Sequence, residues 1–117
     1  VKTITVNEGT TTIEHNAFAG TNKLSTVNLP NSLAVIEKNT FSYNVLGMAT
    51  KKITINYAGT MDEWKKMLAN SKSVDKDNAE WHNGLGNGTK VICSDGYFEL
   101  DRGWTGVGGY DWEEHPN

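Results

Sequence analysis

The 117 residues include 11 basic and 14 acidic side chains, and 37% of them are hydrophobic. This composition predicts one soluble domain and leaves little room for a second independent core. The formal charge of -3, with scattered basic residues, excludes the basic patch that nucleic-acid binding requires. No apolar run approaches the roughly 20 residues of a membrane-spanning helix, so membrane insertion is not expected.

The chain starts at Val1, inside a strand-like pattern and without an initiator methionine. We therefore expect it to be a piece of a longer protein and, taken alone, to be monomeric. Its single cysteine, Cys93, excludes an internal disulfide and a multi-cysteine metal site. Because Cys93 follows the apolar residues Val91 and Ile92, we expect an inert thiol in a buried strand.

An apolar pattern with a period of 23 residues organises the first half of the chain. Residues two apart share one face of a strand, so Val27 and Leu29 predict a short strand with one buried face. One such unit cannot bury that face alone, and stacked units with parallel strands can, which predicts a solenoid. Five apolar pairs carry the period: Val1 and Leu24, Ile4 and Val27, Val6 and Leu29, Ile13 and Ile36, Phe18 and Phe41.

A third, longer unit is expected after the first two. Ile53 and Ile55 repeat Val27 and Leu29 at an offset of 26, which implies three inserted residues around positions 45–50.

The pattern from Leu24 to Phe41 resembles the BspA-type leucine-rich repeat of bacterial surface proteins, and Val1 to Phe18 matches it almost as well. Ala17-Phe18 keeps the Ala-Phe pair that usually stands near the end of this repeat. The segments at 55–64 and 91–96 resemble the sequence that commonly closes such arrays. The resemblance implies a secreted or cell-surface bacterial protein that takes part in adhesion.

A helix and a hairpin are predicted after the repeats. Thr60 and Glu63 have the spacing of a capping box, which predicts a helix from Met61. Trp64, Met67 and Leu68 would share one face of this helix and cover the open end of the stack. Asp95-Gly96 between the β-prone runs 90–93 and 97–100 predicts a hairpin.

The predicted fold class is α+β, a short leucine-rich-repeat solenoid with parallel short strands, capped by a helix and a C-terminal β-hairpin. The repeats would occupy 1–58, in units of about 1–23, 24–46 and 47–58, and the capping helix, loop and hairpin 59–100. The glycine- and aromatic-rich tail at 101–117 fits neither pattern. A packed extension, a linker and a disordered segment all remain open for it.

Two surfaces are candidates for ligand binding. Strand residues between the buried positions point outward and form a polar ladder: Thr3, Thr5, Thr26, Asn28, Lys52 and Thr54. Such a ladder suits protein or glycan recognition, although it also serves simply to keep a sheet face soluble. Three tail aromatics have no obvious core around them and would offer a patch if exposed: Trp104, Tyr110 and Trp112.

No enzyme, cofactor or metal site is expected. No acid, base and nucleophile stand together, and the histidines at 15, 82 and 115 lack a zinc-binding spacing. The stretch 75–80 resembles a calcium loop only faintly, because Glu80 stands where the loop requires glycine. Trp64 and Trp81 are expected to be packing residues.

The leading hypothesis is a non-catalytic binding and adhesion module whose partner is a host or matrix protein, or a glycan. Two alternatives remain open at this point. The chain could be a structural spacer or targeting appendage of a larger secreted enzyme, or a carbohydrate-binding module that uses the C-terminal aromatics.

Overall fold

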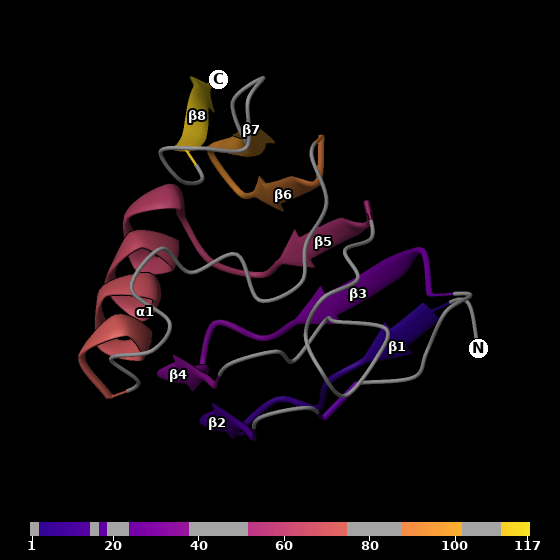
Figure 1. Cartoon of the computed structure of the whole chain (residues 1–117), viewed down its shortest axis with the longest axis vertical. Coiled ribbons are helices and arrows are strands. Elements are labelled where there is room, and N and C mark those ends of the chain that lie inside the picture. Colours follow the sequence, from indigo (N-terminus) through magenta and orange to yellow (C-terminus); the bar gives the residue numbers. More distant parts are fainter. Residues whose placement is uncertain (1–2, 15–16, 19–23, 38–51, 75–87, 102–110) are drawn as a thin grey trace.

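The computed structural model describes residues 3–14, 17–18, 24–37, 52–74, 88–101 and 111–117 (Figure 1). Phe41, the inserted residues near 45–50, the stretch 75–80, Trp81, Trp104 and Tyr110 lie outside these ranges. The described residues form one helix, α1 (Met61–Val74), and eight strands. The strands are β1 (Thr3–Thr5), β2 (Thr12–Ile13), β3 (Thr26–Leu29), β4 (Val35–Ile36), β5 (Thr54–Tyr57), β6 (Lys90–Cys93), β7 (Gly96–Asp101) and β8 (Asp111–Pro116).

Six of these strands form one mixed sheet in the order β1-β3-β5-β6-β7-β8, and β2 and β4 form a separate pair. The pairs between β1, β3, β5 and β6 are parallel, whereas β7 pairs antiparallel with both β6 and β8. Ile4 lies opposite Val27, and Ile13 lies opposite Ile36. Both pairs are 23 residues apart, so the predicted period and the parallel pairing of the first two units are confirmed.

The turns of the first two units are also joined to each other. The Ser32 hydroxyl accepts a hydrogen bond from the amide of Gly9 at 3.1 Å and donates to the carbonyl of Thr10 at 2.8 Å. Gly9 has a φ of 91°, which a residue with a side chain rarely adopts. One serine side chain therefore ties the turn of the second unit to that of the first.

The predicted register of the third unit is wrong. Val27 lies opposite Ile55 and Leu29 opposite Tyr57, which is an offset of 28 rather than 26. The error has a physical cause. Ile53, Ile55 and Tyr57 stand at every second position, so a shift of the register by two residues still keeps apolar side chains on the inner face. All three side chains are buried, and the apolar pattern alone could not choose between the two registers.

One row of apolar side chains crosses the sheet on its inner face. Ile4, Val27, Ile55, Val91 and Phe98 are register partners in turn, from the parallel strands into the antiparallel ones. The last four are at most 2% exposed, while Ile4 on the edge strand β1 is half-buried. This apolar row links the repeats to the chain that follows them.

Helix α1 begins at Met61, as the capping box predicts. The Glu63 amide donates to the Thr60 hydroxyl at 3.2 Å, and the Thr60 amide donates to the Glu63 carboxylate at 3.0 Å. Trp64, Met67 and Leu68 are buried, whereas Lys65 and Lys66 are exposed, so the predicted amphipathic face is confirmed. In Figure 1 the helix runs along the side of the molecule from the level of β4 to that of β6, and it contacts β4 and β7.

The end of the chain packs against the sheet. β8 pairs along the whole of β7, and the Lys65 ammonium on α1 lies 2.6 Å from the Glu114 carboxylate on β8. The Trp112 ring meets the Trp64 ring edge-on, with centroids 6.4 Å apart. Residues 111–117 are thus a packed extension, one of the alternatives left open by the sequence.

Replacing Trp64 with alanine is expected to lower the free energy of unfolding by about 3–5 kcal/mol, because a fully buried indole is lost from between Tyr57 and Trp112. Urea unfolding followed by circular dichroism measures the change. Lys66→Ala, on the exposed side of the same helix, is the matched control and should stay within about 0.5 kcal/mol of the parent. Equal losses in the two variants would contradict the packing described above.

Candidate functional site

The outward face of β1, β3 and β5 carries two rows of polar side chains. Thr3, Thr26 and Thr54 are register partners in the first row. Thr5, Asn28 and Asn56 are register partners in the second. The inward neighbours Val27, Leu29, Ile55 and Tyr57 are buried, so these polar residues stand on the opposite face.

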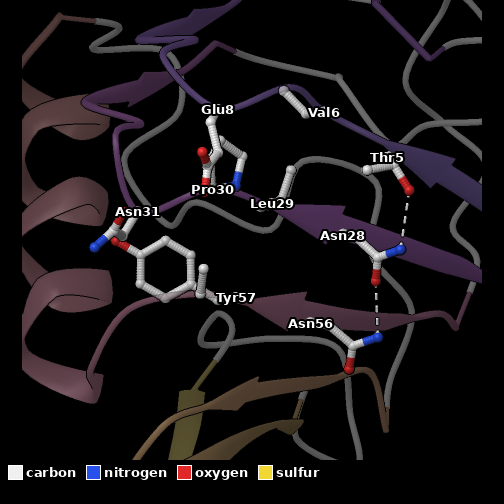
Figure 2. Close-up of a pocket in the computed structure, with 10 residues that line it drawn as sticks. Thr5, Val6, Glu8, Asn28, Leu29, Pro30, Asn31, Asn56 and Tyr57 are labelled. Atoms are coloured by element: carbon white, nitrogen blue, oxygen red, sulfur yellow. Dashed lines mark hydrogen bonds between the residues drawn. The ribbon is translucent and has the colours of Figure 1, made fainter.

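The second row is a hydrogen-bonded chain of side chains, here called the amide ladder (Thr5, Asn28 and Asn56). The Asn28 amide group donates to the Thr5 hydroxyl at 3.0 Å, and the Asn56 amide group donates to the Asn28 carbonyl at 2.9 Å. Figure 2 shows the three side chains in line across three neighbouring strands. Both amides therefore have fixed orientations, with their donors aimed toward β1.

A pocket of about 300 Å³ lies where β1, β3 and β5 end. The amide ladder forms one side of it (Figure 2). The other side is formed by residues at and beyond the strand ends: Val6, Glu8, Leu29, Pro30, Asn31, Tyr57 and Ala58. Polar groups on one side thus face a largely apolar surface on the other.

The apolar side of the pocket depends on a close approach at Gly59. A Cβ atom at this position would lie 2.7 Å from Cε2 of Tyr57 and 3.1 Å from Cβ of Asn31. Any side chain there would displace the ring or the neighbouring turn. Gly59 thus allows the Tyr57 ring to lie beside Asn31, as Figure 2 shows.

The buried phenol of Tyr57 is held in its neutral form. Burial, with smaller contributions from Glu63 and Cys93, raises the pKa of Tyr57 to about 12. The Tyr57 ring, which like any phenol is uncharged at neutral pH, therefore stays uncharged in alkaline solution as well.

The structure places five of the six predicted ladder residues on the outward face of the strands: Thr3, Thr5, Thr26, Asn28 and Thr54. The sixth, Lys52, is misplaced by the two-residue register error and precedes β5. Asn56 takes the position beside Asn28. The signal that could have identified it is the repeated pair Asn28-Leu29 and Asn56-Tyr57, 28 residues apart.

The described residues do not form the aromatic patch that was predicted for the tail. Trp112 is half-buried and packs against the core, and Trp104 and Tyr110 lie outside the described ranges. The residues that sequence reasoning missed are those at and beyond the strand ends, Glu8, Pro30, Asn31 and Tyr57. Their neighbourhood depends on how the turns of different units stack, for which no local motif exists.

The outward face continues across β6, β7 and β8 with a different character. Asn56 is followed by Ile92, Tyr97 and His115 as register partners, and Ile92 is 43% exposed. The rings of Tyr97 and His115 stack at 4.6 Å, and the Lys90 ammonium lies 5.2 Å from the Tyr97 centroid. The amide ladder therefore ends at β5, whereas the row of Thr3, Thr26 and Thr54 continues as charged residues, Lys90, Glu99 and Glu113.

Cys93 is buried at the end of β6, as expected for a core thiol. Burial, with the nearby Asp95, raises the pKa of this thiol to about 11. A nucleophilic cysteine needs a lowered pKa and access to substrate, so Cys93 is not suited to catalysis. Within the described ranges, no three His, Cys, Asp or Glu residues are grouped so as to hold a metal ion.

The first 63 residues match the family profile described as "BspA type Leucine rich repeat region (6 copies)". The match covers more than half of the chain, and the chain therefore belongs to the BspA-type leucine-rich-repeat family. Families of such repeats are generally non-catalytic. No curated protein and no solved structure matches the chain.

In the described part of the chain, no helix is long and apolar enough to cross a bilayer.

Between about pH 9 and pH 11 the free energy of unfolding is expected to fall because of Cys93. The pKa of Cys93 is raised in the folded state, so the folded chain keeps the thiol proton at a pH where the unfolded chain loses it. The contribution of the neutral thiol to the free energy of unfolding is fully present below about pH 9, the pKa of an exposed thiol, and is lost as the pH rises through 11. Urea unfolding of the parent and of Cys93→Ala at several pH values measures the two slopes. The variant should lose less stability over this interval, and parallel slopes would contradict the assignment.

Proposed function

We propose that the chain is a non-catalytic adhesion module of a secreted or cell-surface bacterial protein, and that its partner is held against the outward face of β1, β3 and β5. The carrying observation is the pair of polar rows on that face. Register sets the positions of both rows, hydrogen bonds fix the side chains of the amide ladder, and the core uses none of these residues. Rows of oriented donors and acceptors on a rigid sheet suit a macromolecular partner, a host or matrix protein or a glycan.

The proposed architecture is the end of a leucine-rich-repeat solenoid. Its repeats occupy 1–58, a helix and a β-hairpin close it at 59–100, and β8 near the end of the tail extends the closing sheet. Supporting this division, the apolar row passes without a break from β5 into β6 and β7, and α1 lies against β4 and β7. The edge strand β8 carries Glu113, Glu114 and Pro116, which discourage further strand pairing.

The alternative use of the tail aromatics for carbohydrate binding is less favoured. Trp112 packs edge-on against Trp64, so its indole takes part in the core. A loss of binding in Trp112→Ala would therefore report a damaged fold as readily as a lost contact. A spacer or targeting role requires only a soluble face and not the hydrogen-bonded order of the amide ladder. Sequencing the flanking gene for a catalytic domain tests that role directly.

The isolated chain is expected to bind at least one member of a panel of immobilised matrix proteins, host glycoproteins and glycans. Thr26→Arg should weaken that binding about tenfold or more, because a long charged side chain would then stand in the middle of the outward face. Biolayer interferometry measures the affinity.

Asn70→Arg adds the same charge on the exposed side of α1 and serves as the control. It should leave the affinity unchanged. A flat response of the parent across the whole panel, or equal losses in both variants, would count against the proposed face.

A further inference from the structure

We propose that the pocket where β1, β3 and β5 end is a binding site for a neutral saccharide of roughly one or two sugar rings. This inference deepens the proposed function, on which it rests, by naming the ligand class for the same face. The pocket volume of about 300 Å³ is at the lower end of the range for small-ligand sites.

The hydrogen-bonding capacity of the amide ladder fits sugar hydroxyls. Each amide group has two N–H donors, and Asn28 and Asn56 each use one of them within the ladder. The Asn56 carbonyl oxygen and the Thr5 hydroxyl proton have no partner among the described residues. Adjacent donors and acceptors in fixed positions match vicinal hydroxyls, each of which both donates and accepts.

The charge around the pocket selects against anionic ligands. None of the described residues that line it is lysine or arginine, and its single charged side chain is Glu8. Glu8 is exposed and has no ion pair within the described part of the chain. A sialylated, sulfated or phosphorylated ligand would meet a carboxylate without a compensating cation, whereas a neutral sugar hydroxyl can donate to it.

The side opposite the ladder supplies an apolar surface. Leu29, Pro30 and Tyr57 are buried side chains that border the pocket, so they are held rigidly. The carbon-bound hydrogens of a sugar ring can pack on such a surface while the hydroxyls reach the ladder. Because the side chains are already ordered, little conformational entropy is lost on binding.

A peptide fits this position less well. An extended peptide gains its main-chain hydrogen bonds by adding to a sheet edge, and the strands that carry the two asparagines, β3 and β5, are both paired on their two sides. The edge strand β1 borders the pocket only with Thr5. Asn28 and Asn56 therefore present only their side chains to a ligand. A ligand that carries its donors and acceptors on its own ring suits that arrangement.

Titration of the ¹⁵N-labelled chain followed by NMR tests the proposal. Neutral oligosaccharides of hexoses and N-acetylhexosamines should shift the side-chain amide resonances of Asn28 and Asn56, with a dissociation constant on the order of 1 mM. Asn56→Ala removes a donor and an acceptor and should weaken binding about tenfold. Thr54→Ala, on the same strand but outside the pocket, should stay within about twofold. Unchanged backbone spectra verify the fold of each variant.

Three results would overturn the proposal. Sialylated or sulfated analogues could bind more tightly than the neutral sugars. A peptide could shift the two asparagine resonances where no saccharide does. Saccharides could shift other residues and leave Asn28 and Asn56 unmoved. If no saccharide binds while Thr26→Arg still abolishes capture of a protein partner, the ligand class is wrong and the proposed adhesion function stands.

Discussion

The structure depends on one continuous row of apolar side chains across the inner face of the sheet. Ile4, Val27, Ile55, Val91 and Phe98 are partners strand after strand, although the strands change from parallel to antiparallel after β6. Because side chains alternate between the two faces of a sheet, burial of this row on the inner face places the flanking residues of each strand on the outer face. The polar rows, and with them the candidate binding face, are consequences of the same burial.

Helix α1 completes the burial at one side of the molecule. Trp64 meets Tyr57 from β5 and Trp112 from β8 edge-on, so one indole connects the repeats, the helix and the last strand. The Ser71 hydroxyl adds a polar link, since it accepts a hydrogen bond from the Ile36 amide in β4 at 2.9 Å. Tyr57 borders the pocket on its other side, and the packing of the helix therefore also holds part of the candidate site.

The face of the sheet divides into parts with different chemistry. Over β1, β3 and β5 it carries hydroxyls and amides, whereas over β6, β7 and β8 it carries Ile92, the stacked Tyr97 and His115 rings, and charged neighbours. The amide ladder ends where Asn56 is followed by Ile92, because an aliphatic side chain cannot continue the hydrogen bonds. The pocket lies on the polar part, which is why a hydroxyl-rich neutral ligand suits it.

The sequence by itself determined the family, the 23-residue period, the inward and outward alternation of the strands and the start of α1. Each depends on contacts that are local or repeated at a fixed distance, such as the capping box and the pair Ile13 and Ile36. The tertiary structure decided the register of β5, which the apolar pattern left undecided because Ile53, Ile55 and Tyr57 satisfy two registers equally well. It also decided the pocket, since Glu8, Pro30 and Tyr57 come from three separate segments that no sequence motif relates. Their proximity follows from how the strands stack and from the close approach of Gly59 to Tyr57 and Asn31, which only the folded chain defines.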